Sequence, residues 1–237
     1  MTESIPDGLI ALTFDDGPKS QYTFAAPLLK ACDFNATFYI TEGLRFLLDK
    51  DRYMTWEEVA ALDRDGFEIG NHTQHHKNVT TQTPNELRAD IDHIDQRCAA
   101  YGISEPTTFC YPGYSNGPAA VTVLQERSFR FARRGTEPEY PYDNEGGRGP
   151  AYDPAVHDPL LIPTTGASGP QWGYDDFLWA LDQARDGCIA VLTFHGVPDL
   201  DHPWVHTEPD LFERYVTHLR DNDFTVVALR DLDRYIR

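Results

Sequence analysis

The sequence predicts an α/β protein built on a parallel sheet. Short apolar runs of strand character alternate with helical segments along the 237 residues, and this alternation is typical of parallel α/β architectures. The number of these units, about seven or eight, matches the dimensions of a barrel. A chain of this length is expected to form one domain, residues 1–237, with a substantial apolar core.

The first half of the chain contains four strand–helix units. Apolar runs predict strands at 9–12, 36–41, 67–69 and 107–111, and helical spacing predicts helices at 21–31, 55–66, 83–100 and 119–126. Two of these helices begin at a capping box, in which a Thr and the Glu three residues later satisfy each other's backbone N–H groups. The boxes pair Thr55 with Glu58 and Thr83 with Glu86.

The second half is less regular. A strand at 129–132 is followed by residues 135–172, which are rich in Gly, Pro and acidic residues and show little periodicity. Because a long irregular stretch inside a compact domain is often functional, we expect it to cover the mouth of an active site. A helix, a strand, a helix and a strand are then predicted at 175–185, 188–195, 209–221 and 224–228, before a C-terminal helix.

Two adjacent carboxylates follow the first predicted strand. Asp15 and Asp16 precede Gly17 and Pro18. Like charges repel, so such a pair is expected where a cation lies between the carboxylates or where catalysis needs both. Asp-Gly-Pro is also ordinary turn chemistry, which makes a solvated turn the alternative.

Histidines follow two further strands. The third strand is followed by His72, His75 and His76, and the last strand but one ends in His195. Two imidazoles and one carboxylate form a common divalent metal site, and imidazoles four residues apart converge where the backbone makes a helical turn. The spacing leaves open whether His72 pairs with His75 or with His76. Because functional groups gather at the carboxyl ends of parallel strands, three such strands indicate one shared site.

These motifs resemble those of the polysaccharide deacetylases, the family-4 carbohydrate esterases, which act on chitin, chitooligosaccharides, peptidoglycan or acetylxylan. The first family motif is matched in full by 13–18, the second by 72–76 and the last by 192–195, in the family's order. The resemblance implies a distorted, incomplete (β/α) barrel of about seven strands. It also implies a hydrolase that removes an N-acetyl or O-acetyl group from a carbohydrate, and it favours His76 as the partner of His72.

The resemblance further implies that Asp16, His72 and His76 ligate a divalent metal, usually zinc, with cobalt, nickel, manganese or iron as alternatives. Asp15 is then the general base toward the attacking water, and His195 is the general acid that protonates the leaving amine. Adjacent residues at an extended strand end point in different directions, so one Asp can bind metal while the other stays free.

The third family motif, Phe-Arg-Pro-Pro-Tyr-Gly, is altered in this chain. The matching stretch is 109–114, in which Cys110 replaces the Arg that normally supports the base. Three arginines elsewhere are candidates to replace it in space: Arg133, Arg134 and Arg148. We interpret Cys110 as a packing residue rather than a nucleophile. The backbone N–H that would hold the oxyanion belongs by position to Gly113.

Aromatic residues are the candidate substrate contacts. Tyr111 and Tyr114 lie in the altered motif, and Trp172 lies where the family has an Asp- and Trp-containing fourth motif that is not clearly present here. An aromatic face suits the apolar face of a sugar, and packing within a loop is the alternative. The segment that follows the His195 strand contains His202, Trp204 and His206. We expect these residues around the same mouth, either as sugar or metal contacts or as solvated loop residues.

Composition limits the partners. The formal charge of −18, from 20 basic and 38 acidic residues, disfavours nucleic acid, anionic membranes and polyanionic substrates. No apolar run approaches the length of a membrane span, and the first seven residues lack a basic region followed by an apolar run. No signal peptide is therefore predicted, and we expect a cytoplasmic protein with four free thiols. The sequence indicates no oligomeric state.

Three functions are compatible with these observations. The first is a metal-dependent deacetylase acting on an N-acetylated sugar. The second is a hydrolase of a small or cyclic amide or imide, which the altered third motif and the expected cytoplasmic placement favour. The third is a non-catalytic module that binds a sugar or a metal, and the intact base, acid and ligand set argues against it.

Overall fold

The structure is a computed structural model that describes residues 2–141 and 146–236. Its strands are β1 (Leu9–Phe14), β2 (Thr37–Ile40), β3 (Glu68–Asn71), β4 (Thr108–Cys110), β5 (Phe131–Arg133), β6 (Gly166–Ala167), β7 (Ala190–Phe194) and β8 (Thr225–Val227). Its helices are α1 (Ala26–Ala31), α2 (Trp56–Arg64), α3 (Pro84–Ala100), α4 (Pro118–Glu126), α6 (Tyr174–Asp182) and α7 (Pro209–Asp221).

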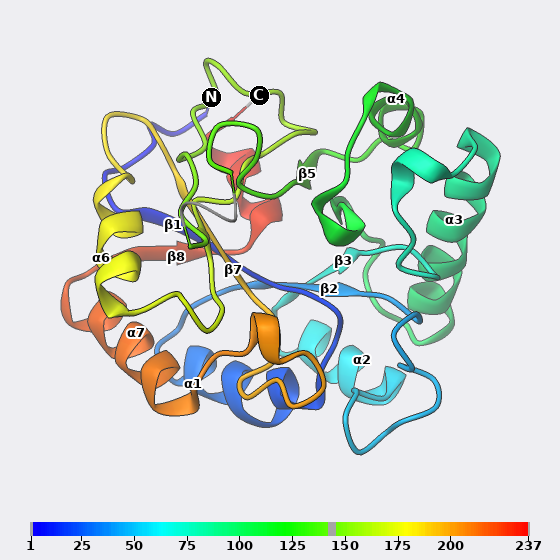
Figure 1. The fold of residues 1–237 in the computed structure, drawn as a ribbon, viewed down its shortest axis with the longest axis horizontal. Helices are drawn as coiled ribbons and strands as arrows, with labels where there is room; N and C mark the ends of the chain where they lie inside the picture. Colours follow the sequence, from blue (N-terminus) through cyan, green and yellow to red (C-terminus); the bar gives the residue numbers. More distant parts are fainter. Residues whose placement is uncertain (1, 142–145, 237) are drawn as a thin grey trace.

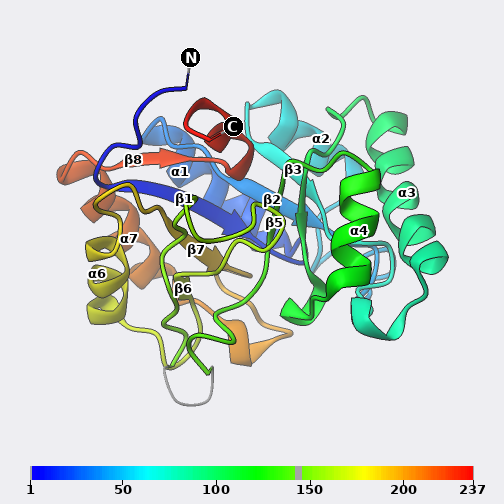
Figure 2. The ribbon, with the colours of Figure 1, turned by 90° about the horizontal axis from the view of Figure 1, so that it is seen from above.

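The described strands form one parallel sheet. Its order is β5-β4-β3-β2-β1-β7-β6, and β8 pairs with the first half of β1 while β2 pairs with the second half. The sheet is curled into a half-barrel, and the helices lie around its outer face (Figures 1 and 2). This arrangement confirms the predicted α/β fold with a distorted, incomplete barrel.

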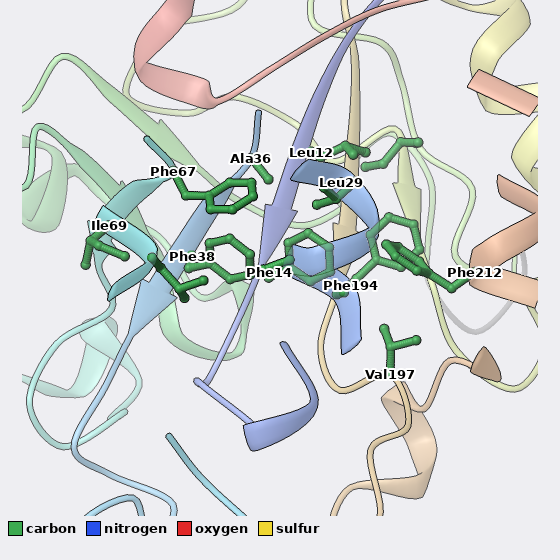
Figure 3. Packing of buried hydrophobic residues seen from close by; sticks show 14 of the residues in the cluster. Leu12, Phe14, Leu29, Ala36, Phe38, Phe67, Ile69, Phe194, Val197 and Phe212 are labelled. Atoms are coloured by element: carbon green, nitrogen blue, oxygen red, sulfur yellow. The ribbon is translucent and has the colours of Figure 1, made fainter. Parts of the chain in front are cut away.

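Aromatic side chains from the central strands build the core between sheet and helices (Figure 3). The ring centroid of Phe14 lies 4.9 Å from that of Phe38 and 5.5 Å from that of Phe194, and Phe194 meets Phe212 of α7 edge-on at 5.2 Å. Each of these buried rings contributes about 1.5–3 kcal/mol to folding. Because strand residues alternate between faces, Thr13 points to the barrel interior, where its hydroxyl donates to a β7 carbonyl.

The predicted loop at 135–172 is partly incorporated into the sheet. The N–H of Ile162 donates to a carbonyl of β5, and the N–H of Thr165 donates to a carbonyl of β7, both at 2.8 Å. The segment therefore bridges these two strands and continues into β6, a strand too short to leave a pattern in the sequence. Of the described residues in the segment, only 135–138 line the cavity described below, so the expectation that the whole stretch covers the mouth is wrong.

Both predicted capping boxes are present. The N–H of Glu58 donates to the Thr55 hydroxyl at 3.2 Å, and the N–H of Thr83 donates to the Glu86 carboxylate at 2.8 Å. The predicted C-terminal helix is instead a 3₁₀ turn, Leu229–Arg234, whose first N–H groups donate to side chains of β2 and β3. In the part of the chain described, no helix combines the length and apolar character needed to cross a membrane.

Candidate active site

Strand register brings the sequence motifs to one edge of the sheet. Phe14 of β1 pairs with Phe194 of β7, so Asp15 and His195 follow at the same level. The N–H of Asp15 donates to the Phe194 carbonyl at 2.9 Å, which extends this pairing by one residue. On the other side of β1, the N–H of His72 donates to the last carbonyl of β2 at 3.1 Å. The three strand ends thus deliver their polar side chains to one place.

The chain turns sharply at the two aspartates. Asp16 and Gly17 both have φ 71°, so the extended conformation expected for this strand end is wrong at Asp16. Asp tolerates this left-handed region better than most residues because its short side chain forms local hydrogen bonds. The amide of Gln21 donates to the Asp15 carbonyl and, at 3.2 Å, to the His195 carbonyl. The turn is therefore tied to the end of β7.

Two left-handed residues direct the histidines toward Asp16. Thr73 has φ 64° and His76 has φ 52°, and the Thr73 hydroxyl accepts the N–H of His76 at 3.1 Å. The backbone between the histidines is thus a compact non-helical turn, not the helical turn expected from their spacing. It places the Nε2 atoms of His72 and His76 each 3.3 Å from Oδ1 of Asp16.

The remaining histidine of the motif, His75, is directed away from this group. Nδ1 of His75 lies 2.7 Å from a carboxylate oxygen of Asp90 on α3, and half of the His75 side chain is exposed. The pairing that spacing left open is therefore His72 with His76, as the resemblance implied.

The atoms around Asp16 suit a divalent cation. One atom each of Asp16, His72 and His76 lies within 4.8 Å of the other two. Oδ1 of Asp16 is buried and has no hydrogen bond of good geometry from the described residues. Nδ1 of His72 lies 2.8 Å from the Cys110 carbonyl, which places the ring proton on Nδ1 and leaves the Nε2 lone pair for a metal. The donor set is one that zinc and related metals prefer.

Charge within this group offsets the cost of burial. Burial would raise the pKa of Asp16, but His72 and His76 hold that pKa well below its ordinary value. Burial would likewise lower the pKa of His72, but Asp16 raises it above the ordinary value. The ligand group is therefore electrostatically complementary even without a metal.

Asp15 is buried against an arginine from the neighbouring strand. Cys110 of β4 and Arg133 of β5 are paired in register. Arg133 therefore lies beside Cys110, the position at which the third family motif has an arginine. Nη2 of Arg133 lies 2.6 Å from both carboxylate oxygens of Asp15, and both groups are fully buried. Burial opposes ionisation of Asp15, but the Arg133 charge holds its pKa below the ordinary value. The other two candidates, Arg134 and Arg148, pair with acidic residues elsewhere.

Cys110 completes this buried contact as a neutral thiol. Its Sγ lies 3.6 Å from Asp15 and 2.9 Å from Nη2 of Arg133, and burial raises its pKa well above the ordinary value. A second possible ligand set, Asp15 with His72 and Cys110, also has its ligand atoms within 4.8 Å of one another. Arg133 already contacts both oxygens of Asp15, however, so this set suits a cation less well. All four cysteines are free thiols.

A cavity of about 820 Å³ opens over these groups. Both aspartates, His72, His76 and His195 line it, as do Gly113 and Tyr114, which follow β4. Nε2 of His195 lies 3.8 Å from both Asp15 and Asp16, while its Nδ1 is buried without a hydrogen-bond partner among the described residues. The Asp15 carboxylate, the His195 imidazole and the compact group of Asp16, His72 and His76 therefore all face the same cavity.

Two of the three aromatic candidates lie outside the cavity. Tyr111 is fully buried, and its hydroxyl donates to the Leu160 carbonyl at 2.8 Å. Trp172 is only 4% exposed and packs against Gly166 of β6. Both expectations are wrong because these side chains point into packed layers, which the sequence does not reveal. Tyr114 does line the cavity.

The loop after β7 supplies the cavity residues that the sequence left undecided. His202 and Trp204 line the cavity, and His206 instead lies 2.9 Å from the carboxylate of Glu208. The available signal was a Trp nine residues after His195, the candidate acid at the end of β7. It could not be weighed without knowing the path of the loop.

A family profile described as polysaccharide deacetylase matches residues 3–132. The chain belongs to the polysaccharide deacetylase family. Over 134 residues it is 29% identical to the peptidoglycan-N-acetylglucosamine deacetylase of Bacillus cereus, covering 55% of this chain and 59% of that protein. Over 118 residues it is 28% identical to the peptidoglycan-N-acetylmuramic acid deacetylase PdaA of Bacillus subtilis, covering 49% and 41%. The chain thus spans only about half the length of these curated relatives.

Solved structures of this family share the fold. A family 4 carbohydrate esterase from Streptomyces lividans, in complex with acetate, superposes with a TM-score of 0.60 at 16% identity, covering 93% of this chain and 92% of that one. A family 4 pseudoenzyme from Bacillus anthracis superposes with a TM-score of 0.62 at 15% identity, covering 98% and 68%. At these identities the likeness establishes the half-barrel and nothing further.

Proposed function

We propose that this polysaccharide deacetylase homologue is a metal-dependent hydrolase that removes the acetyl group from an N-acetylated sugar. One observation carries the proposal. Asp16, His72 and His76 converge within 4.8 Å of one another on the wall of a cavity that also exposes Asp15. The relatives support the substrate class, because both curated proteins are described as deacetylases of N-acetylated peptidoglycan sugars.

The proposed metal site is formed by Asp16, His72 and His76. We infer zinc as its occupant, since one carboxylate and two imidazoles suit zinc and leave positions open for water and substrate. A divalent metal bound there would polarise the acetyl carbonyl and lower the pKa of a coordinated water from 15.7 toward about 7.

The remaining groups supply the proton transfers. Asp15 is proposed as the general base, because its carboxylate lines the cavity and is kept ionised by Arg133. His195 is proposed as the general acid toward the leaving amine, since its Nε2 faces the same space. The N–H of Gly113, at the cavity wall, is the proposed donor to the oxyanion.

The two rival functions have less support. The case for a small-amide hydrolase rests on the altered third motif and on the expected cytoplasmic placement, and Arg133 weakens the first ground because it supplies a cation to Asp15 from the next strand. The case for a non-catalytic module has a precedent in the Bacillus anthracis pseudoenzyme, of which a mutant is described as having restored activity. In this chain the base, the acid and the ligand group all face one cavity.

Metal analysis and acetate release together test the proposal. Purified protein should hold about one equivalent of divalent metal and release acetate from N-acetylglucosamine oligomers. His76→Ala should lose both properties, and Asp15→Asn should keep the metal while losing turnover. His75→Ala is the matched control from the same loop and should keep both, because His75 faces Asp90. Metal retention by a double variant lacking His72 and His76 would refute the site.

A further inference from the structure

The mouth of the cavity carries an exposed tryptophan that the proposed chemistry does not use. Trp204 is 64% exposed in a short 3₁₀ turn, Pro203–Val205, after β7. Five large apolar side chains are strongly exposed among the described residues, and Trp204 is the one of them that lines the cavity. A large aromatic surface left open to water at a cavity mouth is typical of a ligand contact.

The loop that carries this tryptophan is held in place. The Asp199 carboxylate accepts the N–H groups of Gly196, Asp201 and His202 at 2.8–3.2 Å, and Asp199 is buried. The ring of His202 lies 5.3 Å from that of Trp204, centroid to centroid. A platform fixed in this way loses little conformational entropy when a ligand binds to it.

Apart from four histidines, the described side chains that line the cavity with Trp204 are neutral or acidic. Ser115, Asn116 and Thr136 line the same cavity and can hydrogen-bond to sugar hydroxyls. No lysine or arginine is among the described residues that line it, whereas Glu137 is, and Glu137 has no ion pair within the described chain. The His202 ring lies 3.5 Å from the Asp199 carboxylate, so even a protonated ring forms a neutral pair.

We propose that Trp204 is the stacking platform for a second sugar ring of the substrate and that the acidic lining selects an uncharged or cationic ring there. A ring bearing a carboxylate, such as a lactyl-substituted sugar, would enter a cavity whose described lining includes Glu137 but no lysine or arginine. The proposal rests on the proposed function for the ring whose acetyl group is removed. It adds a specificity determinant remote from that group.

Two variants of the same loop test the platform. Trp204→Ala should raise the KM for a tetramer of N-acetylglucosamine about fivefold at unchanged kcat, the factor that a stacking contribution near 1 kcal/mol corresponds to. It should weaken binding of the glucosamine tetramer, which has no acetyl group to lose, by a similar factor in calorimetric titration. Leu200→Ala is the matched control, because Leu200 is equally exposed but does not line this cavity.

A third variant tests the charge selection. Wild-type protein should bind the disaccharide of N-acetylglucosamine and N-acetylmuramic acid more weakly than the disaccharide of N-acetylglucosamine, and Glu137→Gln should narrow that difference. Equal binding of both disaccharides by the wild-type protein would overturn the proposed selection against a carboxylate-bearing ring.

The outcomes separate this inference from the proposed function. Unchanged binding and KM in Trp204→Ala would overturn the platform even if acetate is released. Trp204-dependent binding of the glucosamine tetramer, without acetate release from any sugar, would overturn the proposed function and leave the platform standing.

Discussion

Replacing Arg133 by Met should disable the proposed base without altering the metal ligands. Asp15 and Arg133 form an ion pair whose side chains are only 2% and 0% exposed, so solvent screens it little. Removing one partner of such a pair leaves a buried uncompensated charge and costs about 3–5 kcal/mol. For a protein of this size, that cost corresponds to a fall in Tm of roughly 6–20 °C.

The same change should move the pH profile. Burial raises the pKa of Asp15, and Arg133 is the main influence that lowers it. Without the guanidinium, the acidic limb of kcat/KM should shift to higher pH, and kcat at neutral pH should fall. Metal content should stay the same, because Asp16 and the two histidines are untouched. Calorimetry measures the fall in Tm, a pH–rate profile measures the shift of the acidic limb, and metal analysis measures the metal content.

Two further variants distinguish loss of the cation beside Asp15 from misfolding of Arg133→Met. Arg133→Lys retains a cation and should recover part of the lost activity. Cys110→Arg combined with Arg133→Met returns the arginine to the family's third-motif position and should restore the acidic limb of the profile. If Arg133→Met folds and keeps both the wild-type profile and the wild-type kcat, the role assigned to Arg133 is refuted.

Three further predictions concern stability and the thiols. Burial alone would raise the pKa of Asp15, and Arg133 lowers it, so the ion pair stabilises the wild type most at neutral pH. The stability gap between wild type and Arg133→Met should therefore close in urea titrations as the pH falls from the raised pKa of Asp15 in the variant through its lowered pKa in the wild type. Thr83→Ala removes a capping hydroxyl from α3 and should cost about 1 kcal/mol by the same measurement, whereas no loss would contradict the capping box. Cys98 and Cys110 are buried and should resist thiol reagents in the native protein, because burial raises the pKa of Cys98 to about 12 and that of Cys110 well above its ordinary value. Cys32 and Cys188 are only partly buried and should react. Four fast-reacting thiols before unfolding would contradict this burial.

Local sequence patterns specify most of the elements and the chemistry of the strand ends. Alternation of apolar runs and helices predicts the parallel α/β class, and Thr-x-x-Glu pairs predict the starts of α2 and α3. The motifs at 13–18 and 72–76 identify the groups that meet in the cavity. These features are readable because each depends on residues within a few positions of one another.

The missing arginine and the cavity walls depend on residues remote in the chain. Cys110 and Arg133 are 23 positions apart, and only the register of β4 with β5 places the guanidinium against Asp15. Tyr111 and Trp172 have the side chains of sugar contacts but point into packed layers, whereas Trp204 remains exposed at the mouth. Strand pairing and side-chain direction arise from the packing of the whole sheet, so no local pattern encodes them.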